Sequence, residues 1–319
     1  MRGLFALVAG AVMSSLGHAQ PVYPERTVRI IIPSAAGGGV DVQARIAANA
    51  LAARLKQPFV VENRVGAGGN IGTAFVAQAP ADGYTLLLTA PALTINQTLY
   101  AKPGFDVKRD FAAVGQWSFS PLVFIAGPQT DARDLKELAA RARAEPGKMS
   151  YASGGIGFIN HLVLEFFRVT AGLDMLHIPF GGQAPALTAI VGGQVAFTVD
   201  SIASAAQSVR AGRVRALATT GRERSPELPA VPTVSESGFP ELVAYTWYGM
   251  FAPAATPTRI LDALNAAMLE SLADPDTQRR IAAIGATPDP KNRAASTAFI
   301  DQELARWKKV VADAKLKAE

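Results

Sequence analysis

Residues 33–41, PSAAGGGVD, join two different periodic patterns and thereby indicate the class of fold. The preceding run TVRIII at 27–32 is rich in β-branched residues, as buried strands are. The following stretch, DVQARIAANALAARLKQ at 41–57, repeats apolar residues at helical spacing. Consecutive glycines let main-chain N–H groups converge where side chains would block them, so the loop is either a ligand site or an ordinary turn. The segment predicts a strand, a glycine loop and a helix in that order.

The same alternation continues along the chain. Strand-like runs follow at FVVEN (59–63), YTLLLT (84–89), PLVFIAG (121–127), KMSYAS (148–153), MLHIPF (175–180), VAFTVD (195–200), VRALATT (214–220) and YTWYGMFAP (245–253). Helical patterns lie between most of them, and the C-terminal part is helical, with Phe299, Leu304, Trp307 and Val311 on one expected core face. This order predicts an α/β protein with mostly parallel sheets, and 319 residues favour about two domains.

The N-terminal 19 residues have the three parts of a secretory signal peptide. Arg2 precedes an apolar run from Leu4 to Met13, and a small-x-small site ends at Ala19. A buried N-terminal helix is the alternative, but the segment has no polar face. We therefore expect cleavage after Ala19 and a mature protein in the periplasm.

Composition excludes several classes of function. The chain has no cysteine, and after removal of the signal peptide only His161 and His177 remain as histidines, so we expect no metal site and no histidine-based triad. The remaining 30 basic and 26 acidic residues give a charge of +4 that is spread along the sequence, which argues against a nucleic-acid partner. GAGGNIG at 66–72 lacks the third glycine of the dinucleotide fingerprint, and no P-loop or nucleophile elbow occurs. We expect no cofactor and no enzymatic activity.

Loops between strands and helices remain as the candidate site. Besides 33–41 they include SGGIG at 153–157, FGGQAP at 180–185 and the glycine-free TAPALTIN at 89–96. Helix N-termini with free N–H groups and small hydroxyl side chains suit a carboxylate. Asp41 and Asp200 either stabilise the first turn of a helix or accept a hydrogen bond from bound water or a ligand amino group. His161 is expected in the core.

Several ordered blocks carry a family resemblance. RIIIPSAAGGGVD, VVENRVGAGGNIGT, YASGGIG, HIPFGGQAPALTAIVGGQV, SPELPAVPTVSESGFP and WYGMFAPAATP together resemble the Bug-type, TctC-like extracytoplasmic receptors of tripartite tricarboxylate transporters, from about Tyr23 onward. The resemblance implies a two-lobed periplasmic binding protein of type II, with residues 20–124 and 248–319 in one lobe and 125–247 in the other. The chain would cross between lobes near 124–126 and 245–249. The implied partners are a small carboxylate, held by main-chain N–H groups and water, and the membrane permease subunits. We expect a monomer.

The resemblance also implies the residues that face the ligand. They are Ser34, Ala35, Gly37, Gly38, Asp41, Thr89, Pro91, Ala92, Asn96, Ser153, Gly154, Gly157, Phe158, Phe180, Gly181 and Asp200. The chain departs from the usual family pattern at Ser34, at Ile156 and Phe158, and near Gly182, where aromatic, polar and basic residues respectively are common. Loss of polar and basic groups predicts a monocarboxylate, or an acid with an apolar or aromatic body, in preference to citrate. The alternatives are an exported enzyme that uses Asp41 and Asp200 as a carboxylate pair, and a receptor that feeds a signalling partner.

Overall fold

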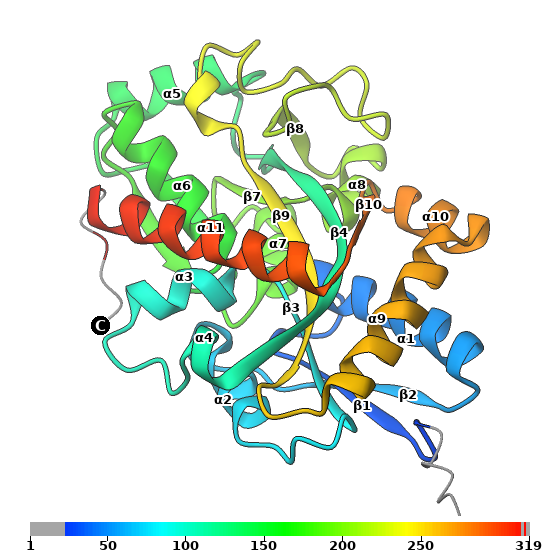
Figure 1. The fold of residues 1–319 in the computed structure, drawn as a ribbon. Coiled ribbons are helices and arrows are strands. Elements are labelled where there is room, and N and C mark those ends of the chain that lie inside the picture. Colours follow the sequence, from blue (N-terminus) through cyan, green and yellow to red (C-terminus); the bar gives the residue numbers. More distant parts are fainter. Residues whose placement is uncertain (1–22, 314–315, 317–319) are drawn as a thin grey trace, which may run out of the picture.

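The computed structural model describes residues 23–313 and Leu316. The expected signal peptide lies outside these residues. The chain forms two lobes, each a sheet covered by helices, and the strands β4 and β9 run through the centre of the molecule (Figure 1).

The first sheet combines parallel and antiparallel strands. Its order is β2 (Phe59–Asn63), β1 (Val28–Ile32), β3 (Thr85–Thr89), β9 (Tyr245–Pro253), β4 (Phe111–Ala126) and β10 (Thr287–Lys291). β1 is parallel to β2 and β3, whereas β9 is antiparallel to β3 and to β4, and β10 is antiparallel to β4.

The second sheet is mixed in the same way. β4 pairs antiparallel with β7 (Phe197–Ser201) and β8 (Arg215–Thr219), and parallel pairing joins β7 to β5 (Ser150–Ser153) and β5 to β6 (Leu176–Pro179). The expected α/β two-lobed architecture is therefore confirmed. Parallel pairing is confined to three strands in each lobe, because the strands that cross between lobes run antiparallel to them.

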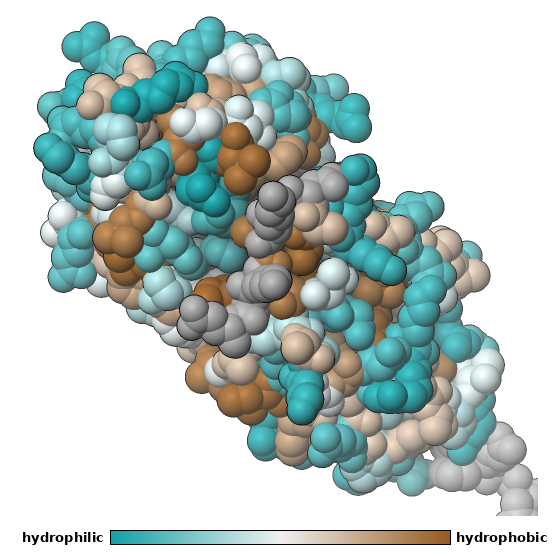
Figure 2. Space-filling view, turned by 90° about the vertical axis from the view of Figure 1, so that its left-hand side faces the viewer, coloured by the Kyte–Doolittle hydropathy of each residue, from teal (hydrophilic) through white to brown (hydrophobic). Residues whose placement is uncertain are grey.

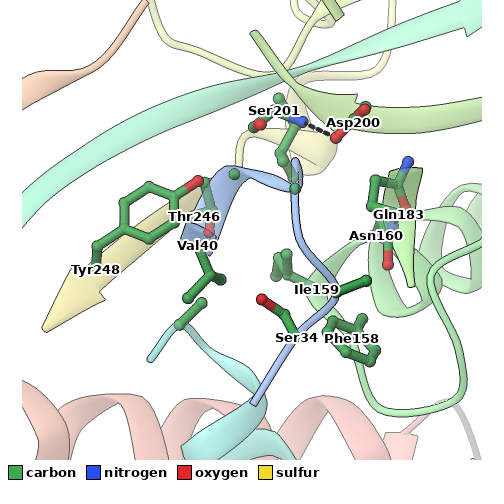
Figure 3. A pocket seen from close by; sticks show the side chains of 15 residues that line it. Ser34, Val40, Phe158, Ile159, Asn160, Gln183, Asp200, Ser201, Thr246 and Tyr248 are labelled. Carbon is green, nitrogen blue, oxygen red and sulfur yellow. Dashed lines mark hydrogen bonds between the residues drawn. The ribbon is translucent and has the colours of Figure 1, made fainter. Parts of the chain in front are cut away.

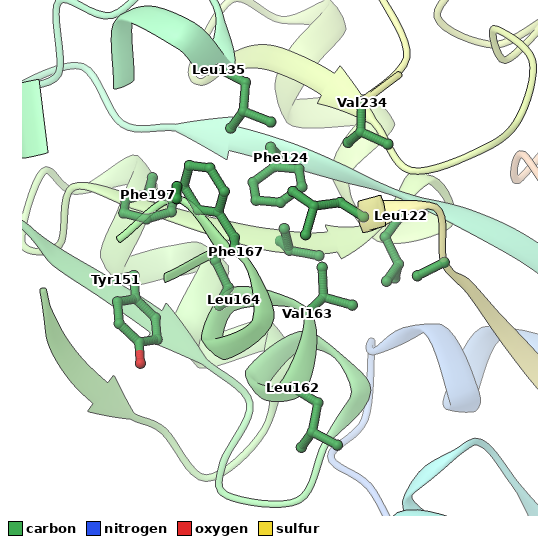
Figure 4. Packing of buried hydrophobic residues seen from close by; sticks show 14 of the residues in the cluster. Leu122, Phe124, Leu135, Tyr151, Leu162, Val163, Leu164, Phe167, Phe197 and Val234 are labelled. Carbon is green, nitrogen blue, oxygen red and sulfur yellow. The ribbon is translucent and has the colours of Figure 1, made fainter. Parts of the chain in front are cut away.

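β4 belongs to both sheets because it is 16 residues long. It pairs with β9 as far as Pro121, opposite Tyr245, and it pairs with β7 from Leu122, opposite Ser201. Side chains of a strand alternate between faces, and Leu122 and Phe124 enter one core of the second lobe while Val123 and Ile125 enter another (Figure 4). Burial on both faces explains why PLVFIAG is a continuous apolar run.

Helices cover both sheets. The first lobe carries α1 (Gly39–Leu55), α2 (Asn70–Ala77), α3 (Ala92–Leu99), α4 (Val107–Asp110), α9 (Thr258–Ala273), α10 (Pro275–Ala282), α11 (Arg293–Asp313) and the 3-10 turn Ala67–Gly69. The second carries α5 (Leu135–Ala144), α6 (Ile159–Thr170), α7 (Gln183–Val191), α8 (Ile202–Arg210) and the 3-10 turn Pro240–Leu242.

The C-terminal helix α11 packs on both lobes. Ile300 and the half-buried Phe299 and Leu304 contact the first lobe, while Trp307 and Val311 enter the core of the second, so the expected apolar face is confirmed. Glu303 accepts hydrogen bonds from the indole N–H groups of Trp247 (2.8 Å) and Trp307 (2.9 Å). One carboxylate thereby ties the helix to β9.

The outer surface shown in Figure 2 is largely hydrophilic, with apolar residues in separate patches. None of the helices in the described part of the chain is both long enough and apolar enough to span a bilayer. Within residues 23–313 and Leu316, no cluster of three or more histidines, aspartates and glutamates could hold a metal ion.

Candidate functional site

A cavity of about 60 Å³ lies between the lobes (Figure 3). One wall comes from the loop before α1 and its first turn, from Ala90 directly after β3 and from β9. The other comes from Leu122 of β4, the end of β7, and the starts of α6 and α7. The lining residues are Ser34, Ala35, Gly38, Gly39, Val40, Ala90, Leu122, Phe158, Ile159, Asn160, Gln183, Asp200, Ser201, Thr246 and Tyr248.

Three helix N-termini converge on this cavity. α1 begins after Gly38, α6 after Phe158 and α7 after Gly182, and none of these three N-cap residues makes a side-chain hydrogen bond. In α6 the side chain of Asn160 accepts a hydrogen bond from His161 N (2.9 Å), so the N–H groups of Ile159 and Asn160 are the ones that face the cavity without a side-chain acceptor. The first N–H groups of a helix have no acceptor within the helix, and the helix dipole adds a partial positive charge there. No lysine, arginine or histidine lines the cavity. This arrangement can attract an anion through the main chain rather than through a cationic side chain.

Two glycines of the opening segment have different roles. Gly37 has φ of 79°, a conformation that side chains disfavour, and it makes the turn. A Cβ atom on Gly39 would lie 2.7 Å from the Tyr248 hydroxyl and 2.9 Å from Ser201 Oγ, which belongs to the second lobe. Gly39 thus allows close approach of the two lobes at the edge of the cavity.

Asp41 holds the glycine loop and does not line the cavity. Its carboxylate accepts hydrogen bonds from Gly37 N (3.1 Å), Asn63 Nδ2 (3.1 Å) and, through both oxygens, from Arg45 (2.9 and 3.0 Å). Burial alone would raise the pKa of Asp41, but the hydrogen bonds from Arg45, Gly37 and Asn63 outweigh it and hold the pKa below its ordinary value. Of the two roles considered for Asp41, the structure favours the stabilising one.

Asp200 is the penultimate residue of β7 and lines the cavity. Its Oδ1 accepts a hydrogen bond from Ser201 N (2.7 Å), and burial raises its pKa to about 7 although neighbouring donors oppose the shift. Asp200 Oδ2 and Ser34 Oγ have no hydrogen-bond partner among the described residues. One unpaired polar atom from each lobe is therefore available to a ligand.

The expected site residues divide into groups. Those that line the cavity are Ser34, Ala35, Gly38, Phe158 and Asp200. Thr89, Pro91 and Ala92 lie beside the lining residue Ala90 without lining the cavity themselves. Gly154, Phe180 and Gly181 also lie outside the lining; a Cβ on Gly154 would meet Gln183 N at 3.0 Å.

Asn96 and Gly157 lie outside the cavity, at a separate contact between the lobes. The side chain of Asn96 lies against Gly157, and its Nδ2 donates to Asn70 Oδ1 (2.7 Å). Beside it, the Tyr100 hydroxyl donates to the carbonyl of Ile156 (3.1 Å). Ile156 itself does not line the cavity.

Ser153 faces a buried aromatic and histidine cluster. Its Oγ lies 2.7 Å from His177 Nε2, and the His177 ring stacks on His161 with centroids 4.5 Å apart. Burial and the neighbouring His177 lower the pKa of His161 to about 4. His161 is buried outside the cavity, in agreement with its expected place in the core.

Sequence reasoning missed several lining residues. They are Gly39, Val40, Ala90, Leu122, Ile159, Asn160, Gln183, Ser201, Thr246 and Tyr248. Most of them lie within two or three residues of an expected position. They would have been predicted if each helix had been expected to start one or two residues earlier. Leu122, Thr246 and Tyr248 lie on the crossing strands, for which no local signal exists.

Comparisons with known proteins identify the family and the fold of this chain. The family model described as "Tripartite tricarboxylate transporter family receptor" matches residues 43–316. Protein BugT of Bordetella pertussis (strain Tohama I) is 37% identical over 97% of this chain and 98% of its own.

Solved structures are similar over nearly their full length. The periplasmic binding protein BugD has a TM-score of 0.89 and 35% identity, covering 93% of this chain and 100% of its own. R. palustris Rpa4515 with adipate has a TM-score of 0.90 and 31% identity, covering 92% and 99%. MatC (Rpa3494) from Rhodopseudomonas palustris with bound malate has a TM-score of 0.86 and 33% identity, covering 91% and 100%.

These are binding proteins rather than enzymes. The chain belongs to the family of tripartite tricarboxylate transporter receptors, the TctC or Bug family.

Proposed function

We propose that the protein is a periplasmic receptor that captures a small carboxylate between its lobes and delivers it to the permease subunits of a tripartite tricarboxylate transporter. One observation supports the proposal most directly: the N-termini of α1, α6 and α7, whose N-cap residues make no side-chain hydrogen bond, meet at one cavity that no cationic side chain lines. Similar proteins have been solved with adipate and with malate, which supports a carboxylate as the anion.

The free energy with which three helix N-termini stabilise an anion is comparable to that of an ion pair. A helix N-terminus stabilises an anion by about 0.3–1 kcal/mol at an exposed site and by about 2 kcal/mol when partly buried. Three termini around one carboxylate group supply up to roughly 6 kcal/mol on that scale, before the cost of desolvating the anion. Donors come from both lobes, so the anion favours the closed arrangement over an open one.

The rest of the wall favours an apolar ligand body. Val40, Ala90, Leu122, Phe158 and Ile159 contribute hydrocarbon to the lining. A second ionised carboxylate would lie against them without a compensating cation, which is costly. We therefore propose a monocarboxylate, or an acid with an apolar or aromatic body, as the preferred solute. Phe158 and Ile156 both stand where polar residues are common in the family. Phe158 supports the preference for an apolar solute because it lines the cavity, whereas Ile156 does not line it and gives no such support.

The hinge for closure of the lobes would lie in the two strands that cross between them, β4 and β9. β4 changes its partner strand between Pro121 and Leu122, opposite Tyr245 of β9, so we place the bending region there. We predict that two rigid bodies move during closure. One consists of residues 20–124 and 248–319, and the other of residues 125–247. Helix α11, which packs on both, would have to slide or bend during opening.

The test is a panel of acids measured by thermal shift and calorimetry on the mature protein. Benzoate and 3-methylbutanoate should raise the melting temperature, by an amount that grows with the logarithm of ligand excess over Kd. Adipate and malate should bind more weakly, and citrate weakest. Tighter binding of citrate than of benzoate would contradict the preferred solute, and no response to any acid would contradict the function itself. Loss of uptake of the bound acid on gene deletion would support transport.

A further inference from the structure

Asp200 is an acidic side chain in a site that we propose to hold an anion. It is 3% exposed, its Oδ1 is occupied by Ser201 N, and its Oδ2 has no partner in the part of the chain that the structure describes. Figure 3 shows it at one end of the cavity, beside Ser201 and opposite Tyr248. An unpaired carboxyl oxygen with this burial calls for a ligand atom or a proton.

The groups around Asp200 are neutral. β7 contributes Ser201, α8 the hydroxyl of Ser204, α7 the amide of Gln183 and β9 the hydroxyl of Tyr248. Tyr248 is the titratable group among them, and burial raises its pKa further above the ordinary value, so it stays neutral. No cationic side chain lines the cavity, and hydrogen bonds from Ser204, Ser201 and Gln183 offset the burial of an ionised Asp200 only in part.

An anionic ligand makes ionisation of Asp200 still less favourable. Two carboxylates that share a small site without a cation do not both remain ionised, and one of them takes a proton. The ligand carboxylate has helix N–H groups to accept from, whereas Asp200 Oδ2 accepts no hydrogen bond. The donors that lie near it, the hydroxyl of Ser204 and the amide of Gln183, are bonded to the main-chain oxygens of Ser201 and Val199. The proton therefore belongs on Asp200.

We propose that the receptor takes up one proton at Asp200 when it binds its carboxylate, and that the neutral acid donates a hydrogen bond from Oδ2 to the ligand. The inference rests on the proposed function. The proton comes from solvent and is released again when the ligand leaves, so no covalent bond is made or broken.

The proposal fixes the sign of the pH dependence. Burial already places the pKa of Asp200 near 7 in the free protein, and a bound anion raises it. Below about pH 6 Asp200 is protonated both free and bound, so the affinity is constant. Above about pH 7 binding must draw a proton from solvent, and Kd should rise about tenfold per pH unit.

Calorimetry with benzoate tests the proposal without any variant. Titrations at pH 5.5 and pH 8.5, each in two buffers of different ionisation enthalpy, give the number of protons taken up. The expected result is close to one proton per benzoate at pH 8.5 and close to none at pH 5.5. Binding at pH 8.5 without proton uptake would overturn the proposal.

Asp200→Asn is the matched variant, because the amide imitates the neutral acid in shape and supplies an N–H donor. It should bind benzoate without proton uptake, with a Kd at pH 8.5 at least tenfold below that of the wild type. Loss of benzoate binding by a folded Asp200→Asn at both pH values would show that the ionised form is needed, and would overturn the proposal. If the wild type binds neither benzoate nor adipate at any pH, the proposed function fails and this inference fails with it; binding without proton linkage defeats the inference alone.

Discussion

Gly39→Ala should weaken carboxylate binding without unfolding the protein. The new Cβ would lie 2.7 Å from the Tyr248 hydroxyl and 2.9 Å from Ser201 Oγ, whereas ordinary contact begins at 3.4 Å. Ser201 belongs to the other lobe, so the lobes must separate by roughly 0.5 Å at this point, and the Tyr248 side chain of the same lobe must shift by roughly 0.7 Å. Overpacking of this kind costs about 1–3 kcal/mol, which corresponds to a Kd about 5- to 150-fold higher. The unliganded protein should keep its melting temperature, because it can open slightly and alanine suits a helix better than glycine.

Two further variants separate this cause from general damage. Gly38→Ala places a Cβ one residue earlier, where the nearest atom is the Ala35 carbonyl oxygen at 3.4 Å and the backbone is extended, so Kd should stay within about threefold of the wild type. Tyr248→Phe removes the nearer of the two oxygens. The double variant Gly39→Ala/Tyr248→Phe should therefore lose less affinity than the sum of its single variants.

The assay is calorimetric titration with benzoate, together with melting curves of the unliganded proteins. Wild-type affinity in Gly39→Ala would refute the reasoning, because the lobes would then not need to meet at Gly39 for the ligand to be held. Equal losses in Gly38→Ala and Gly39→Ala would refute it as well, since a general effect on the loop would explain both.

Three other variants test separate parts of the structure. Asp41→Asn should lower the melting temperature at pH 7. Because the pKa of Asp41 is lowered in the folded state, the difference in melting temperature between wild type and variant should shrink as the pH falls below about 4. A constant difference from pH 7 to pH 3 would contradict this. Phe158→Ala should weaken benzoate binding by about 1–3 kcal/mol and acetate binding much less, as seen by calorimetry; equal losses would remove Phe158 from the ligand contact. Glu303→Ala leaves the indole N–H groups of Trp247 and Trp307 unpaired. It should therefore lower the free energy of unfolding, measured in urea, by about 2–5 kcal/mol. The control is Asp301→Ala at an exposed position of the same helix, which should lower it by less than about 0.5 kcal/mol.

The elements of the fold follow from local patterns in the sequence. The β-branched run at 27–32 and the helical spacing after Asp41 predict β1 and α1, and the apolar run at 245–253 coincides with β9. The length of β4 does not follow in this way. Its first half, 111–120, contains small and polar residues that the neighbouring strands bury, so only PLVFIAG has the pattern of a strand.

Several of the predicted loops reach the cavity between the lobes, but the residues that line the cavity are not always the predicted ones. The helices begin one or two residues away from the starts that the sequence indicates. For this reason Gly37 and Gly181 were predicted as site residues, whereas Gly39 and Gln183 line the cavity. Tyr248 was missed because its role depends on contact with Ser201 across the two lobes. Such contacts depend on how the lobes close, and no short stretch of sequence contains that information.

The most direct test of main-chain anion binding is a crystal structure of the protein with benzoate. We expect the carboxylate oxygens to lie about 2.7–3.2 Å from main-chain nitrogens at the start of α1 and at the start of α6 or α7, with no arginine or lysine within about 4 Å. A benzoate carboxylate that pairs with an arginine, or that lies outside the cavity between the lobes, would contradict this expectation.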